Sequence, residues 1–149
     1  MKALLIFMVL WGHLYAMDTR STLNLYQDLL SALIPKKVIR VYVPDQELHD
    51  VFTHSVSLIP VSQLQKADIV IVPNKTLYER IISELASQKV SKSPLLFATD
   101  YHLLDEYPNV IGALYWRKGR SQLLFINSRL KKYGISLPEK YQKYSVDTL

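Results

Sequence analysis

Six residues near the middle of the chain, Ala67–Val72 (ADIVIV), constrain its fold more than any other segment. After Asp68 every position is apolar, which is typical of a strand that is buried on both faces. Strands of this kind lie inside parallel sheets whose two faces are covered by helices. The segment therefore predicts an α/β fold in which Ala67–Val72 is a central strand.

Helices and further strands alternate with this segment along the chain. Apolar residues at three- and four-residue spacing predict helices, and β-branched apolar runs predict strands. The expected helices are Thr19–Ile34, Asp45–Thr53, Thr76–Ser87 and Asp100–Tyr107, and the expected strands are Val38–Val43, Ser57–Val61 and Leu95–Ala98. This alternation favours a mainly parallel sheet with helices on both faces.

The carboxyl-terminal third differs because two strands follow each other directly. Val110–Trp116 and Gln122–Ile126 flank a basic turn, which predicts an antiparallel β-hairpin with Gly119 at positive φ. Two short helices, Ser128–Tyr133 and Pro138–Tyr144, are expected after it. We therefore expect a three-layer α/β sandwich in one domain, with a mainly parallel sheet and a C-terminal antiparallel β-hairpin at the sheet edge.

The amino-terminal segment predicts export. Lys2 precedes the apolar run Leu4–Trp11, and Leu14-Tyr15-Ala16 offers a cleavage site. The run is shorter than the roughly 20 residues that span a bilayer. We expect a signal peptide over residues 1–16, a periplasmic location and a single domain over residues 17–149. An uncleaved membrane anchor is the alternative. The chain has no cysteine, so this exported domain depends on its core alone.

The motifs of common catalytic and metal sites are missing. The chain has no GxSxG, HExxH or CxxC sequence, and its four glycines form no phosphate-binding loop. His49 and His54 are five residues apart and would point to different sides of a helix. We expect no catalytic residue, no metal and no cofactor. An enzyme of unrecognised type is an alternative, and it would need converging ionisable groups with perturbed pKa values.

The ends of the predicted strands are a first candidate site. In open α/β sheets, ligands bind outside the carboxyl ends of the strands. Asn74 and Lys75 follow one strand, and Thr99 and Asp100 follow the next. These four residues are candidates for binding a small ligand, for which an anion is the first choice. The alternative is that they cap helices and shape turns without any ligand.

The predicted hairpin is a second candidate site. Tyr115 and Trp116 precede Arg117, Lys118 and Arg120, and the whole chain has a net charge of +5. Aromatic residues and arginine are enriched at protein interfaces, so we expect a protein partner here. We expect no nucleic acid because the protein is exported, and self-association remains open. The alternative is an exposed basic turn whose aromatic side chains are half-buried in the sheet.

The carboxyl-terminal third also resembles the YfiR family of small periplasmic proteins. In that family a glycine precedes the hairpin, an arginine follows its turn, and an asparagine closes the last strand before a helix and a glycine. Gly112, Arg120, Asn127 and Gly134 match these positions. The best-known member restrains an inner-membrane diguanylate cyclase by binding its periplasmic part. The resemblance implies binding without catalysis.

Two functions are therefore expected. The first is a periplasmic, non-catalytic regulatory or sensor-partner protein that modulates an inner-membrane signalling protein such as a diguanylate cyclase. The second is a reduced periplasmic solute-binding domain that captures a small ligand at the carboxyl ends of the strands. The first predicts a functional hairpin, and the second predicts a pocket near Asn74 and Thr99.

Overall fold

A computed structural model describes residues 19–89 and 92–149, so the predicted signal peptide lies outside the described residues. An N-terminal helix extends to residue 33. The other helices are α2 (Gln46–Phe52), the short 3-10 helix η1 (Leu64–Lys66), α3 (Lys75–Ser87), α4 (Tyr101–Glu106), α5 (Asn127–Lys132) and α6 (Glu139–Gln142). The strands are β1 (Ile39–Tyr42), β2 (Leu58–Pro60), β3 (Ile69–Val72), β4 (Leu95–Ala98), β5 (Val110–Arg117), β6 (Arg120–Ile126) and β7 (Ser145–Val146).

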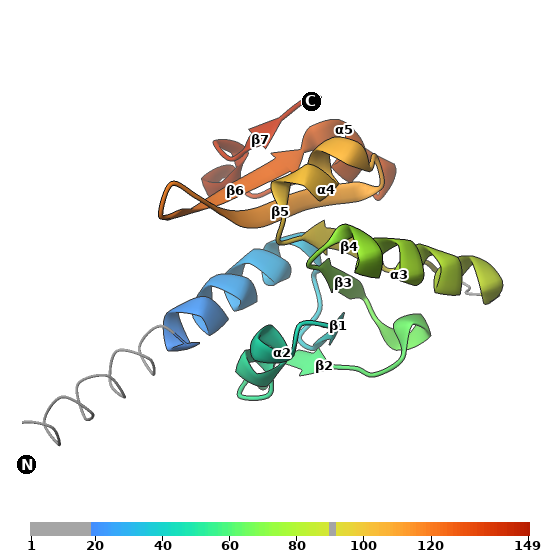
Figure 1. The fold of residues 1–149 in the computed structure, drawn as a ribbon. Helices are drawn as coiled ribbons and strands as arrows, with labels where there is room; N and C mark the ends of the chain where they lie inside the picture. Colours follow the sequence, from blue (N-terminus) through green and yellow to red (C-terminus); the bar gives the residue numbers. More distant parts are fainter. Residues whose placement is uncertain (1–18, 90–91) are drawn as a thin grey trace, which may run out of the picture.

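These strands form one seven-stranded sheet in the order β2-β1-β3-β4-β5-β6-β7. Every neighbouring pair is parallel except β5 and β6, which are antiparallel. After β1 the chain moves to one side for β2 and then crosses to the other side for β3 (Figure 1). The direction of winding therefore reverses between β1 and β3, which is where such sheets usually bind ligands.

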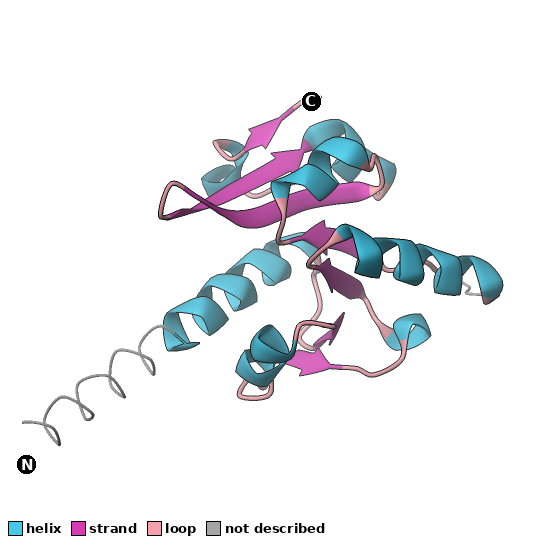
Figure 2. Ribbon diagram, viewed as in Figure 1, coloured by secondary structure: helices cyan, strands magenta, loops and turns pink. Residues whose placement is uncertain are grey.

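Helices cover both faces of this sheet, so the predicted three-layer α/β arrangement is confirmed (Figure 2). Ile69 and Ile71 belong to the core with the N-terminal helix, whereas Val70 and Val72 belong to the core with α3 and α4. All four side chains are buried. Burial on both faces is what the apolar run in Ala67–Val72 predicted, and β3 is an interior strand.

Three of the helices begin at polar caps. Asp45 accepts a hydrogen bond from the Leu48 amide at 2.8 Å and starts α2. Asn74 starts α3 in the same way, and Asp100 starts α4. Each cap satisfies an amide that the first helical turn leaves without a partner. The helices α2, α3 and α4 therefore begin shortly after the carboxyl ends of β1, β3 and β4.

The predicted hairpin is present and its turn has two residues. Lys118 and Gly119 have φ of 51° and 75°, so both central residues of the turn are left-handed. This is the pattern of the turns that match the twist of a β-hairpin. The sequence predicted positive φ at Gly119 but not at Lys118.

The prediction that the hairpin forms the sheet edge is wrong. The two-residue strand β7, which the sequence did not predict, pairs in parallel with β6 and lies outside it. The Asn127 amide donates hydrogen bonds to the Ser145 hydroxyl and the Asp147 carboxylate, each at 3.2 Å, and so holds β7 in place. The helix expected over Pro138–Tyr144 is also shorter, because α6 has only four residues.

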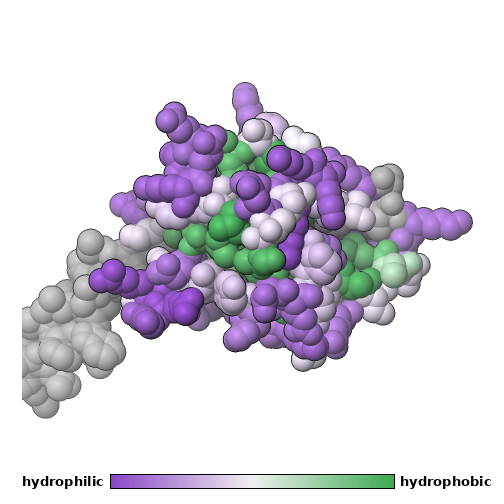
Figure 3. Space-filling view, turned by 90° about the horizontal axis from the view of Figure 1, so that it is seen from above, coloured by the Kyte–Doolittle hydropathy of each residue, from purple (hydrophilic) through white to green (hydrophobic). Residues whose placement is uncertain are grey.

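The surface of the described part carries limited areas of apolar side chains. In the view from above, hydrophobic side chains lie in areas bounded by hydrophilic ones (Figure 3). None of the helices in the described part is both long and apolar enough to span a membrane. Trp116 is the largest exposed apolar side chain in this part of the molecule, with 75% of its surface accessible.

Candidate functional site

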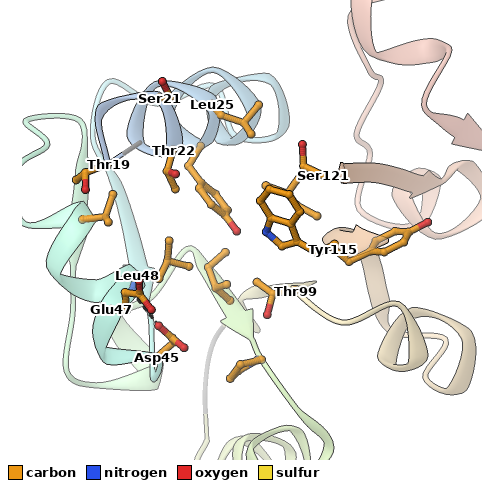
Figure 4. A pocket seen from close by; sticks show the side chains of 16 residues that line it. Thr19, Ser21, Thr22, Leu25, Asp45, Glu47, Leu48, Thr99, Tyr115 and Ser121 are labelled. Atoms are coloured by element: carbon orange, nitrogen blue, oxygen red, sulfur yellow. Dashed lines mark hydrogen bonds between the residues drawn. The ribbon is translucent and has the colours of Figure 1, made fainter. Parts of the chain in front are cut away.

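A cavity of about 550 Å³ lies at the carboxyl ends of the parallel strands, beside the reversal between β1 and β3. The N-terminal helix, α2 and the arms of the hairpin form three of its walls (Figure 4). The described residues that line it are Thr19, Ser21, Thr22, Leu25, Tyr26, Asp45, Glu47, Leu48, Val51, Ile71, Pro73, Thr99, Leu114, Tyr115, Trp116 and Ser121. A cavity of this size and place is typical of a binding site for a small molecule.

Most of this lining is apolar. Leu25 comes from the N-terminal helix, Leu48 from α2 and Ile71 from β3, while Leu114 and Trp116 come from β5. Alternate residues of a strand point to opposite faces, which is why Leu114 and Trp116 share the cavity side. Apolar walls of this kind bind the body of a ligand by excluding water from it.

Tyr115 points to the other side of β5. Its ring lies 5.3 Å from the ring of Tyr101 in α4, measured between centroids. Figure 4 shows its side chain directed away from the centre of the cavity. Tyr115 therefore supports the position of α4 against β5, and Trp116 is the aromatic residue that β5 offers to the cavity and to solvent.

The polar groups of the cavity lie mainly on the walls that the N-terminal helix and α2 provide. Asp45 and Glu47 are at the start of α2, opposite Ser121 of the hairpin (Figure 4). Thr22 lies on the N-terminal helix, and Thr99 follows β4. With Thr19 and Ser21 of the N-terminal helix, the lining offers two carboxylates and five serine or threonine hydroxyl groups.

Tyr26 adds a phenol to the same region. Its residue is only 4% exposed, and its ring packs edge-on against Phe52 at a centroid distance of 5.2 Å. Burial and the negative charge of Asp45 raise the pKa of the Tyr26 phenol. The phenol therefore stays protonated at neutral pH.

The strand-end candidates separate into two groups. Thr99 lines the cavity, whereas Asn74 and Asp100 cap α3 and α4. Lys75 forms an ion pair with Glu106 at 2.7 Å, and this hydrogen bond raises the pKa of the Lys75 ammonium group. Capping and pairing account for three of these four residues without a ligand, and a ligand role for them stays a prediction.

The hairpin candidates also separate. Trp116 is exposed and also lines the cavity, so it belongs to both candidate sites. Arg117, Lys118 and Arg120 are exposed, and none of them forms an ion pair with another residue of the described part. Their positive charges remain open to a partner.

The family-motif positions mainly support the fold. Gly112 lies where Phe125 and Phe97 leave no room for a side chain. Gly134 has a φ of 68° and ends α5, and the amide of the residue after it donates to the Leu130 carbonyl. Asn127 holds β7, as described above. Arg120, on the hairpin, is exposed and has no such role in the fold.

Most residues of the cavity, among them Thr22, Tyr26 and Glu47, escaped the sequence analysis as ligand contacts. All three lie on the predicted helices Thr19–Ile34 and Asp45–Thr53, to which no ligand role was given. The signal for Tyr26 is its phenol among leucines, because a hydroxyl in such a face needs a hydrogen-bond partner.

A second cavity of about 730 Å³ lies at the opposite, amino ends of the strands. Its walls include Asp68, to which Lys36 donates at 2.7 Å and the Arg40 amide at 2.9 Å. Burial disfavours the charge of Asp68, but these hydrogen bonds lower its pKa overall. The main polar groups here therefore satisfy one another. In the part of the chain that the structure describes, no three His, Cys, Asp or Glu side chains lie close enough to hold a metal ion.

Comparison with known proteins supports the fold. No family model matches the chain, and no curated protein matches it. Its fold is similar to the crystal structure of a conserved domain protein from Vibrio cholerae, with a TM-score of 0.55 and 14% sequence identity. The similarity covers 85% of this chain and 60% of that one, so the chain spans less than two thirds of the Vibrio protein.

Proposed function

We propose that this chain is an exported, non-catalytic regulatory protein that binds a protein partner through the tip of the β5–β6 hairpin. The observation that carries the proposal is the exposure of Trp116, at 75%, beside three cations without ion-pair partners in the described part. Exposing the large apolar ring of a tryptophan to water is unfavourable. Tryptophan and arginine also contribute most of the binding energy at many protein interfaces.

The geometry of the turn favours an acidic partner. Arg117 and Arg120 are directly paired across the two strands, and Trp116 is paired with Ser121. Like charges at directly opposite positions destabilise a hairpin. A carboxylate on a partner removes this repulsion and accepts two hydrogen bonds from each guanidinium group. The hairpin is thus suited to an acidic surface with an apolar recess for Trp116.

The resemblance to the YfiR family supports the choice of an inner-membrane signalling protein as partner. The amino-terminal signal motif supports a periplasmic site of action. Export is tested by mass spectrometry of the protein isolated from cells. We expect a mature terminus at Met17. An intact mass that retains residues 1–16 would contradict cleavage.

The binding proposal is tested by complementation of a deletion strain, with cyclic di-GMP as the readout. The test variant combines Arg117→Ala and Arg120→Ala, which removes two exposed charges. The matched control combines Lys131→Ala and Lys132→Ala, which removes two exposed charges from α5. We expect the hairpin variant to accumulate normally and lose regulation, while the control behaves as the wild type.

A further pair of substitutions, Asn74→Ala with Thr99→Ala, separates the two candidate sites. If this variant loses function while the hairpin variant retains it, solute binding replaces partner binding as the function. Solute binding is the second candidate because the cavity unites Thr99 with Trp116 under mostly apolar walls. In that case a ligand would stabilise the protein against unfolding in proportion to its concentration.

A further inference from the structure

We infer that the cavity binds a small organic cation, in which an ammonium group is attached to an apolar body. The inference deepens the second of the two proposed functions. It shares Trp116 with the hairpin tip but does not depend on Arg117, Lys118 or Arg120. It rests on the charges of the cavity, a hydroxyl that opens onto it from a buried residue, and the aromatic residue at its edge.

The charge of the cavity is opposite to that of the chain. The whole chain has a net charge of +5, yet both charged residues that line the cavity in the described part, Asp45 and Glu47, are acidic. No lysine, arginine or histidine is among these lining residues. An anion would lose its water beside two carboxylates, whereas a cation would gain two attractive partners. The expected preference for an anion therefore does not suit this cavity.

Tyr26 is the second and independent observation. The residue is 96% buried and lines the cavity, and its hydroxyl forms no hydrogen bond with another residue that the structure describes, so the hydroxyl is accessible only from the cavity. A hydroxyl in such a position takes its hydrogen-bond partner from water or from a ligand in the cavity. Because the Tyr26 phenol stays protonated, its oxygen can accept a hydrogen bond from an ammonium group, and its proton can be donated to water or to another group of the ligand.

Trp116 supplies the third element. Indole is the aromatic ring that attracts cations most strongly, through the negative potential of its faces. Trp116 lines the cavity and remains 75% exposed, so a ligand can cover its ring. Leu25, Leu48 and Leu114 provide the apolar contacts for the rest of the molecule. The volume of about 550 Å³ lies in the range of cavities that hold drug-sized molecules.

Three probes of one shape and different charge test this inference. They are 2-phenylethylamine, 2-phenylethanol and phenylacetate, which are cationic, neutral and anionic at pH 7. The chain has two tryptophans, Trp11 and Trp116, so Trp11→Phe in the full chain makes Trp116 the only one. The fluorescence of Trp116 and, separately, isothermal titration calorimetry then measure the binding of each probe. We expect the amine to bind at least about tenfold more tightly than the alcohol, with the acid weakest. Equal binding of all three, or tightest binding of the acid, would overturn the inference.

Substitutions then locate the bound charge. Asp45→Asn keeps a side chain that can cap α2, and Glu47→Gln keeps its shape. Together they should weaken amine binding at least about tenfold and leave the alcohol unchanged. Asp50→Asn is the matched control, because Asp50 is an exposed acid on α2 that does not line the cavity. An equal loss in the control would overturn the inference, since general charge would explain binding.

The remaining arms separate ligand from partner. Tyr26→Phe should weaken the binding of the amine and leave the binding of the alcohol unchanged. The hairpin variant with Arg117→Ala and Arg120→Ala should bind the amine as the wild type does, whatever its effect on regulation. Binding of a lysine-containing peptide without any binding of the free amine would overturn the inference and assign the acidic wall to a protein partner.

Discussion

Gly112 and Phe125 face each other across β5 and β6 with no space for a side chain on the glycine. A Cβ atom at position 112 would lie 2.7 Å from the Phe125 ring and 3.1 Å from the Phe97 ring. Gly112→Ala should therefore destabilise the fold by about 1–3 kcal/mol through overpacking. Urea denaturation measures the change. Adding Phe125→Leu should recover part of this loss, and a double variant no better than the sum of its parts would refute the contact as the cause.

Arg129 joins α5 to the end of α4. Its Nη1 atom donates to the carbonyls of Leu104, Tyr107 and Val110 at 2.7, 3.0 and 2.8 Å. Arg129→Ala should cost about 1–3 kcal/mol of unfolding free energy, because these half-buried acceptors lose a charged donor. Lys132→Ala on the same helix is the control and should change stability by less than about 0.5 kcal/mol. If both substitutions changed the unfolding free energy equally, water would be able to donate to the three carbonyl groups in place of Arg129.

The unfolding free energy should depend on pH through Asp28. Hydrogen bonds from Lys140 and Tyr141 lower the pKa of this carboxyl group in the folded protein. The folded pKa is below the unfolded value, so the stabilisation is present above about pH 4 and is lost as the pH falls through the folded pKa. Because Asp28 and Lys140 are exposed, their ion pair should contribute less than about 1 kcal/mol to the unfolding free energy.

Asp28→Asn is the test of this contribution. The difference in urea midpoint between the wild type and this variant should be largest near pH 6 and should vanish near pH 2. A difference that stays constant with pH would show that packing, and not charge, sets the role of Asp28.

Lys118 has a left-handed backbone conformation, at a turn position that favours asparagine or glycine. Lys118→Asn should raise the unfolding free energy by about 0.5–1 kcal/mol, because asparagine tolerates positive φ better than lysine does. Thermal unfolding measures the gain. Arg117 and Arg120 stay in place in this variant, so regulation should persist. A loss of regulation would assign Lys118 a direct contact with the partner.

Local patterns were enough to predict most of the fold. The apolar run of β3, the periodicity of α3 and the polar caps Asp45 and Asp100 depend on near neighbours in the sequence. The strand β7 could not be predicted in this way, because two residues carry no periodicity and their partners, Phe125 and Ile126, lie about twenty residues earlier in the chain. Element ends also differ by a few residues where propensity and pairing compete.

The candidate site was predicted only in fragments. Thr99 and Trp116 were chosen for different reasons and assigned to competing sites, and the fold brings both to one cavity. Asp45 was predicted only as the first residue of a helix and not as part of the cavity wall. Its position opposite Ser121 depends on how the N-terminal helix, α2 and the hairpin pack, which no single segment of sequence encodes.

The short strands at the two borders of the sheet also bear on solubility. The outer strand β2 has three residues and ends in Pro60, which has no amide hydrogen to donate, and β7 has two residues fastened by Asn127. Neither border offers a long ladder of free backbone groups on which another chain could extend the sheet. These two short edge strands should therefore protect the protein from aggregation at high concentration. Removal of residues 145–149 would expose β6, and fibrous or amorphous self-association is the expected result.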